Sequence, residues 1–338
     1  MEGLSDPAMR ASLNTSFFIR KFVRYFTLVF TIIFLNFAMP RLMPGDPLLF
    51  LFGEEVYGAA IRNPELIQSL SAKYGLNKPI FDQFIIYLGN LFRGDLGYSF
   101  SYGRPIAEII AERVPLTLLM TLPPTLLSLV TGAMLGLHLG FNPERAHKKA
   151  ISSLLMVLYS VPPYWMAIVA ILVFSLWFNL TPIGGAPSPG MSIITGVSHM
   201  ILPFSVIALF NAAYVAIIMR GLTLEIAEEP FIITAKSKGL SYIKFKIRHL
   251  FIPSLAPFLS IAAIELGFTF SGALLVEIAF SWPGMGYTMW QAVVERDYPL
   301  LQATFTMTAL IVVLANALAD LASYAIDPRI RLRENGRN

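Results

Sequence analysis

Four histidines are the first side chains to consider as metal ligands or general bases. The chain contains no cysteine, so thiolate ligands and thiolate nucleophiles are excluded. The histidines are His138, His147, His199 and His249. None belongs to an H-E-x-x-H pair, and no G-x-S-x-G turn supplies a nucleophilic serine. A G-x4-G-K-[ST] phosphate-binding loop is also absent from the sequence. We therefore expect no catalytic residue, no metal site and no ATP hydrolysis by this chain.

Three carboxylates, Glu265, Glu277 and Asp320, stand in long apolar stretches. An acid at the centre of a bilayer costs about 2.5 to 3.5 kcal/mol, so these side chains should face protein or water rather than lipid. Each could cap or pair with a neighbouring helix, or line a path through the membrane. For Glu265 both alternatives stay open, whereas Glu277 and Asp320 lie nearer the ends of their stretches, where helix packing or gating is favoured. Asn211 and the proline pairs 123–124 and 162–163 could mark polar or bent segments of the same path, or the prolines could be ordinary kinks.

A basic segment separates two of the apolar stretches. Residues 233–250 read ITAKSKGLSYIKFKIRHL and contain five Lys and Arg. Such a segment could face anionic lipid head groups as an interfacial helix, or it could bind a protein.

The composition indicates which class of protein contains these residues. The chain has 338 residues, of which 56% are hydrophobic and only 14% charged, and its mean hydropathy is +0.65. Soluble domains carry about 25% charged residues. The sequence therefore predicts an integral membrane protein of the all-α class.

Six apolar segments are long enough, or nearly so, to cross a hydrocarbon core, which takes about 20 helical residues. They are 22–40, 116–140, 151–180, 200–219, 255–281 and 300–326. An even number of spans places both termini on one side of the membrane.

The distribution of Lys and Arg predicts which side that is. The two termini and the connections on their side carry 17 Lys and Arg, against 8 on the opposite side. By the positive-inside rule both termini are cytoplasmic. The predicted divisions are a cytoplasmic tail (1–21), a permease domain (22–326) with an extracytoplasmic segment (41–115) and a cytoplasmic loop (220–252), and a second tail (327–338).

The extracytoplasmic segment is too long for a simple connection and should form a small ordered structure. Apolar spacing predicts helices over 64–74 and 80–92, ended by Gly75 and Gly94.

The cytoplasmic loop should contain a helix over about 225–239. Pro230 suits a first helical turn and Gly239 suits a C-terminal stop. Ala235 and Gly239 lie four residues apart on one face, where small side chains let another surface approach closely.

The pattern R-x3-L-E-x5-F-x2-T-A-K-S-K-G-L-S-x7-H, which begins at Arg220, resembles the cytoplasmic coupling loop of ATP-binding-cassette import permeases, and most of all the dipeptide and oligopeptide branch. Further matches occur in family order over about residues 18–331. They include Pro44-Gly45-Asp46-Pro47, Gly94-Asp95-Leu96-Gly97, Glu277 with Phe280 to Gly286, Asp297-Tyr298-Pro299 and Asp327-Pro328-Arg329.

The resemblance implies a role for several groups of residues. The residues implied to couple the chain to an ATPase are Glu225, Phe231, Thr234, Ala235, Lys238, Gly239, Leu240, Ser241 and His249. The extracytoplasmic family motif comprises Gly45, Asp46, Pro47, Gly94 and Asp95. Asn211, Glu265, Glu277 and Asp320 are the candidates for the translocation path or its gate.

The resemblance also implies a function and a set of partners. The chain would be a permease subunit of a binding-protein-dependent importer of di- or oligopeptides, in the cytoplasmic (inner) membrane of a bacterium or archaeon. Its partners would be a second homologous permease subunit, cytoplasmic ATPase subunits that bind ATP and Mg, an extracytoplasmic solute-binding protein and the lipid bilayer, but no nucleic acid. This chain itself would bind no cofactor. The alternative is a self-sufficient ion-coupled secondary transporter, against which stands the absence of a charged relay across several spans.

Overall fold

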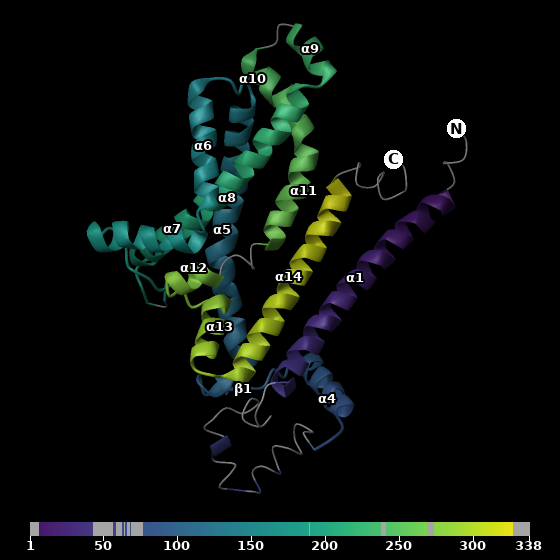
Figure 1. Cartoon of the computed structure of the whole chain (residues 1–338), viewed down its shortest axis with the longest axis vertical. Helices are drawn as coiled ribbons and strands as arrows, with labels where there is room; N and C mark the ends of the chain where they lie inside the picture. The colour runs from purple at the N-terminus through teal and green to yellow at the C-terminus, as the bar shows by residue number, and fades with distance from the viewer. Residues whose placement is uncertain are drawn as a thin grey trace. The chain divides into compact units, whose positions relative to one another are not determined.

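The computed structural model describes residues 7–42, 57–58, 63, 65, 68, 77–188, 190–237, 241–268 and 274–326 (Figure 1). Several predicted features therefore lie outside the described residues. These are Gly45, Asp46, Pro47, Lys238, Gly239, Leu240, most of the helix predicted over 64–74, and the C-terminal tail.

The described chain is mostly helical, as the sequence predicts. Four helices contain a stretch long and apolar enough to cross a membrane: α1 (Pro7–Leu42), α5 (Ile106–Gly140), α8 (Ile193–Ala227) and α14 (Tyr298–Ile326). The first, second, fourth and sixth predicted spans fall within them. These helices are longer than predicted, and α8 extends well beyond 200–219 at both ends.

The predicted span 151–180 is bent and consists of more than one helix. It is made of α6 (Ala146–Ser160), α7 (Pro163–Ala170) and the π-helical segment η1 (Ile171–Trp177), and α6 is bent by 97° relative to the pair that follows. The break falls at Val161-Pro162-Pro163. Two consecutive prolines supply no backbone N–H groups and exclude the preceding residues from helical conformation, so the ladder of α6 ends there.

The predicted span 255–281 also falls on more than one element. It covers most of α11 (Ile252–Phe268) and all of α12 (Leu274–Ala279), and the five residues between them lie outside the described chain. Before α11 come the short helix α10 (Tyr242–Phe245) and the π-helical segment η2 (Lys246–Phe251).

The chain forms two compact units, one of residues 1–116 and 283–313 and one of residues 117–282 and 314–338. In the first unit, α4 (Ile80–Phe92) confirms the helix predicted over 80–92. Its Phe84 packs edge-on against Phe37 of α1, with ring centroids 5.0 Å apart. The guanidinium of Arg41 lies 3.7 Å from the centroid of the Phe37 ring and donates to Gln83 Oε1 at 3.1 Å. Burial lowers the pKa of Arg41 to about 10, which leaves it cationic at pH 7.

The first unit also contains a two-stranded antiparallel hairpin, β1 (Tyr98–Ser99) and β2 (Arg104–Pro105), followed directly by α5. Helix α13 (Met285–Val294) precedes α14. Asp297 lies directly before α14 and caps it, since its Oδ1 accepts the backbone N–H of Leu300 at 3.1 Å. This is the arrangement of an N-cap, in which a side-chain oxygen satisfies an otherwise unpaired helix donor.

In the second unit, the residues 117–140 of α5 pack closely on α8. A Cβ atom at Gly136 would lie 2.5 Å from the carbonyl oxygen of Ala216, and one at Gly140 would lie 2.6 Å from Thr223 Cβ. The glycines therefore permit an approach of the two helices that any larger residue would prevent.

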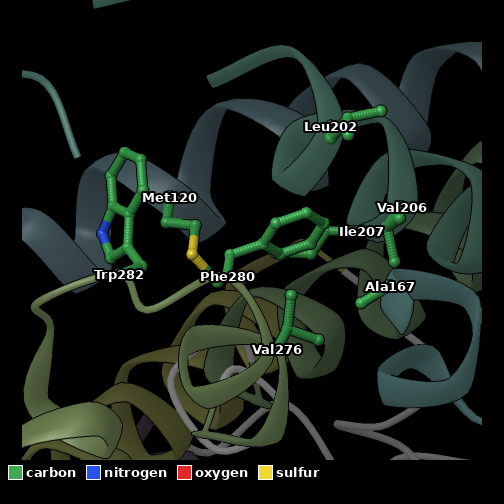
Figure 2. Close-up of a cluster of buried hydrophobic side chains, with 8 residues drawn as sticks. All are labelled: Met120, Ala167, Leu202, Val206, Ile207, Val276, Phe280 and Trp282. Atoms are coloured by element: carbon green, nitrogen blue, oxygen red, sulfur yellow. The ribbon is translucent and has the colours of Figure 1, made fainter. Parts of the chain in front are cut away.

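A buried apolar cluster joins α5, α7, α8 and α12 in the same unit (Figure 2). Phe280 and Trp282 are its largest members, and both are at most 2% exposed. Met120 of α5 and Val206 of α8 contribute smaller side chains. Because buried side chains in such a cluster are close-packed, this packing fixes the broken helices against the long ones.

Candidate functional site

Helix α9 (Pro230–Ser237) lies within the helix predicted over about 225–239, and Pro230 is in its first turn as expected. The helix is shorter than predicted, because Glu225 still belongs to α8, which ends at Ala227. It follows α8 after a two-residue turn, in which the backbone N–H of Glu229 donates to the carbonyl of Ile226 at 3.1 Å. One side of α9 is buried in the protein's own fold, since Ile232 and Ala235 are 1% and 3% exposed. The position of α9 is thus tied to the end of α8.

The opposite side of α9 is exposed and partly apolar. Phe231 is 45% exposed and Ile233 is 74% exposed, and Thr234 is also exposed. Ala235 was expected to contact another protein. Its side chain instead packs on Phe245 and Leu250 of this chain. The surface of α9 available to a partner therefore consists of the larger side chains, not of Ala235.

Aromatic contacts connect α9 to the turn between α5 and α6. Phe245, which packs in one cluster with Ile232 and Ala235, has its ring centroid 5.7 Å from that of Phe141. On the other side, the ring of His249 lies 5.8 Å from Phe245. His249 thus supports the packing beneath α9 and is only partly exposed.

Lys148 of α6 binds the C-terminal end of α5, next to the aromatic contacts of Phe141 and Phe245. Its Nζ donates to the carbonyl oxygen of His138 at 2.7 Å and also to that of Phe141. The side chain is almost fully covered, with 2% exposure. A cation at the C-terminus of a helix satisfies carbonyl groups that have no partner within the helix and interacts favourably with the helix dipole.

Two more of the residues implied to couple the chain to an ATPase lie among those that the structure describes. Glu225 and Ser241 are exposed, and the carbonyl of Ser241 accepts the backbone N–H of Phe245 at 2.9 Å. The structure places Phe231, Thr234 and Ser241 at the surface.

Glu277 of α12 is fully buried and accepts a hydrogen bond of 2.6 Å from the hydroxyl of Thr117 on α5. Thr117 is itself 1% exposed. The carboxylate therefore joins two helices, which is the packing role favoured for it from the sequence.

Asn211 of α8 is partly buried, and its amide donates to Thr125 Oγ1 of α5 at 3.2 Å. Glu265 of α11 and Asp320 of α14 are also partly buried. The Cβ position of Gly267, close to Glu265, faces Asn316 Oδ1 at 2.9 Å. None of the three polar residues is fully exposed, as the cost of placing them in lipid requires.

Gly94 and Asp95 form the turn after α4. Gly94 has φ of +75°, which glycine adopts without strain, and Asp95 Oδ1 accepts the backbone N–H of Gly97 at 3.0 Å. The backbone N–H of Ile106 then donates to the carbonyl of Gly97 at 3.1 Å. This part of the extracytoplasmic motif shapes the connection from α4 through the hairpin to α5.

Sequence reasoning did not single out the hydrogen bonds of Asp297 in the first unit. Its Oδ2 accepts from Ser99 Oγ at 2.6 Å and from Ser101 Oγ at 2.8 Å, so one carboxylate holds both the hairpin and the start of α14. Next to them, burial raises the pKa of Tyr102, and the positive charge of Arg113 opposes that shift.

Thr117 and Thr125 were also missed, although the sequence contains a signal for them. Polar residues recur at 117, 121, 125 and 128, which is the spacing of one helix face in an uncharged segment. All four side chains are at most 2% exposed. Over the described residues, no group of three or more His, Asp or Glu side chains could hold a metal ion.

Comparison with known proteins identifies a family over nearly the whole chain. Residues 109–332 match the family described as binding-protein-dependent transport system inner membrane component. Residues 14–121 match the family of N-terminal regions of binding-protein-dependent transport system membrane components.

Three relatives illustrate the similarity. A putative peptide transport system permease protein of Brucella abortus (strain 2308) is 31% identical over 297 residues, which cover 88% of this chain and 93% of the relative. The di/tripeptide transport system permease protein DppB of Pseudomonas aeruginosa (strain UCBPP-PA14) is 29% identical, with 94% of this chain and 98% of the relative covered. The dipeptide transport system permease protein DppB of Escherichia coli (strain K12) is also 29% identical, with coverage of 93% and 98%.

These matches extend over the long apolar helices, the broken helices and the loop that carries α9. The chain is a multi-pass membrane protein, and it belongs to the family of inner membrane components of binding-protein-dependent transport systems.

Proposed function

We propose that this chain is the membrane-spanning subunit of an ATP-driven importer of di- or oligopeptides. The proposal is supported by the names of its relatives, which are peptide, di/tripeptide and dipeptide transport system permease proteins. Because this similarity covers about nine-tenths of both chains, it is not confined to one shared segment.

Six crossings fit this function, with both termini in the cytoplasm. The crossings are α1, α5, the bent pair of α6 with α7 and η1, α8, the elements from η2 to α12, and α14. The excess of Lys and Arg on one side supports this orientation. Residues 1–21 and 327–338 are then cytoplasmic tails, 22–326 the permease domain, 41–115 the extracytoplasmic segment and 220–252 the coupling loop.

Helix α9 is the coupling helix in this proposal. Its buried side is held by Ile232 and Ala235, while Phe231, Ile233 and Thr234 stand exposed. A helix that is fixed on one side and presents apolar side chains on the other can transmit the movement of a docked protein to α8. Lys238, Gly239 and Leu240 belong to the motif on which the resemblance rests, and we propose a coupling role for them on that ground alone.

The proposed partners follow from the family. Cytoplasmic ATPase subunits bind ATP and Mg and dock on α9, a second permease subunit completes the path, and a solute-binding protein delivers the peptide from outside. The chain contains no phosphate-binding loop, so we propose that it binds no nucleotide and is not itself an enzyme. Asn211, Glu265, Glu277 and Asp320 are the polar residues proposed to line or gate the path.

The exposed apolar side of α9 carries this proposal, and one substitution tests it. Ile233→Glu places a charge where the ATPase would dock, so co-purification of the ATPase subunits in mild detergent should be lost while the variant still inserts. Ile193→Glu is the matched control, because Ile193 is 85% exposed at the other end of α8. Equal recovery of ATPase with both variants would exclude α9 as the docking site. Transport of peptide by the chain alone, without ATP, would instead identify an ion-coupled transporter.

A further inference from the structure

A layer of aromatic and polar side chains crosses the second unit at one level. The ring of Tyr159 on α6 stacks on Phe210 and Tyr214 of α8, with centroids 5.3 Å and 5.2 Å away. One turn from Tyr214, Asn211 donates to Thr125 of α5. Tyr159 remains 42% exposed, so the aromatic stack is accessible from one side.

Glu265 belongs to the same layer. On α11, Phe258 and Ala262 pack in one cluster with Val215 and Met219 of α8, and Tyr214 lies against this cluster. Glu265 follows Ala262 by three residues and therefore stands on the same side of α11, facing α8. Its carboxylate interacts electrostatically with the Tyr214 hydroxyl.

These residues stand at corresponding positions along their helices. The ends of α5 and α8 meet the segment before α11 in one buried cluster beneath α9. Tyr159, Tyr214 and Glu265 are each 13 residues from the near end of α6, α8 and α11. At 1.5 Å per residue this is about 20 Å along α6 and α8, and less for α11, which bends by 55° between Leu255 and Pro257.

The helix of α6 breaks at this layer. Ser160 ends α6 directly after Tyr159, and the following helix departs at 97° (Figure 1). Broken helices within a membrane are tolerated where they line a cavity or are buried in protein, and transporters use such points to bind their solutes.

The layer contains the carboxylate of Glu265 but no cationic side chain, which indicates the kind of group that it would bind. Residues 114–137, 150–198, 200–219 and 250–268 contain no Lys, Arg or His. A carboxylate beside aromatic ring faces, with an amide within reach, is a set of groups that attracts an ammonium ion through charge, hydrogen bonding and cation–π contact.

We propose that Glu265, the stacked rings of Tyr159, Phe210 and Tyr214, and Asn211 form a transit site for the primary ammonium group of a solute. This inference rests on the proposed peptide import and deepens it, since a peptide carries such a group at its N-terminus or on a lysine side chain. The site would hold the cationic end of the peptide midway through the membrane. A negative charge in such a place also raises the local concentration of cations.

The absence of cysteine from the chain allows a direct test of the charge in this layer. In the assembled importer, Tyr159→Cys is reacted with two thiosulfonate reagents of similar size, one a cationic trimethylammonium and the other an anionic sulfonate. We expect the cation to react at least about tenfold faster, and we expect Glu265→Gln in the same background to bring the two rates together. Glu108→Gln, at an exposed position on α5, is the control and should leave the ratio unchanged. Equal rates with Glu265 present, or no reaction with either reagent, would overturn the proposal.

A second experiment measures ATP-dependent uptake of trialanine by the importer in proteoliposomes. Glu265→Gln should lower the uptake rate about tenfold, Glu265→Asp should restore part of it, and ATPase co-purification should not change. Full uptake by Glu265→Gln would overturn the transit site and leave peptide import intact. If the wild-type importer takes up no trialanine, peptide import fails, and the ratio of thiosulfonate rates alone decides whether the layer is a cation site.

Discussion

The hydroxyl of Thr117 donates a 2.6 Å hydrogen bond to the carboxylate of Glu277, and both side chains are at most 1% exposed. The bond joins the long helix α5 to the short helix α12 inside the second unit. A buried carboxylate that loses a donor pays for its desolvation without compensation, so this contact holds α12 in place more firmly than a bond at the surface would.

Replacing Thr117 by valine removes the donor and keeps the shape of the side chain. We expect Thr117→Val to lower the free energy of unfolding by about 1–3 kcal/mol, measured by denaturation of the purified protein in detergent micelles. Thr131→Val is the control, because Thr131 is exposed on the same helix and its hydroxyl bonds only to the carbonyl of Leu127. An equal effect of both substitutions would mean that the bond to Glu277 contributes nothing specific.

Close packing of α5 on α8 gives a second prediction. A Cβ at Gly136 would lie 2.5 Å from the Ala216 carbonyl oxygen and 2.7 Å from Met219 Cβ, so Gly136→Ala must push the helices apart. We expect a loss of about 1–3 kcal/mol, as for other overpacked interiors. The measurement is again denaturation in micelles.

Gly221 of α8 provides the opposite case with the same substitution. No atom lies within 4 Å of a Cβ placed there, so Gly221→Ala should be neutral or should stabilise the helix by about 0.5–1 kcal/mol. If Gly136→Ala proved as harmless as Gly221→Ala, the two helices would not be in the close contact that the glycines allow.

The membrane class, the approximate positions of the spans and the place of Pro230 in the first turn of α9 could be predicted from the sequence. They depend on local properties, namely a run of apolar residues and the missing N–H of proline. Pro162 and Pro163 indicated a bent segment or an ordinary kink, but the size of the 97° break after Ser160 was not predicted. Apolar runs of this length fit one straight span equally well, and prolines are common within spans, so composition alone did not separate the two cases.

The roles of individual site residues depended on partners distant in sequence. Ala235 was expected to contact another protein, but Phe245 and Leu250 of the same chain cover it. The partner of Glu277 is 160 residues away, and that of Asp297 is 198 residues away. No local pattern specifies such pairs, because only the packing of whole helices and loops brings them together.

Adjacent lysines at the start of α6 give the last prediction, since one is buried and the other exposed. Lys148 holds the carbonyl groups of His138 and Phe141 at the end of α5, and Phe141 in turn packs on Phe245 beneath α9. Lys148→Met keeps the length of the side chain but removes the cation. We expect it to lower the free energy of unfolding by about 1–3 kcal/mol and to weaken ATPase co-purification, because carbonyls at the helix end lose their donor and the support of α9 loosens.

Lys149→Met is the matched control. Lys149 donates to the exposed Glu144 at 2.6 Å, and this bond holds the pKa of the Glu144 carboxyl below its usual value. The folded-state pKa is lowered, so any stabilisation is present at neutral pH and disappears as the pH falls through that pKa. Water and salt screen an ion pair that is fully exposed, so Lys149→Met should change neither unfolding nor ATPase recovery measurably at pH 7. Should the two lysine variants behave alike at that pH, the buried ammonium would not support α9, and the connection from the α5–α6 turn to the coupling helix would have to run through the aromatic rings alone.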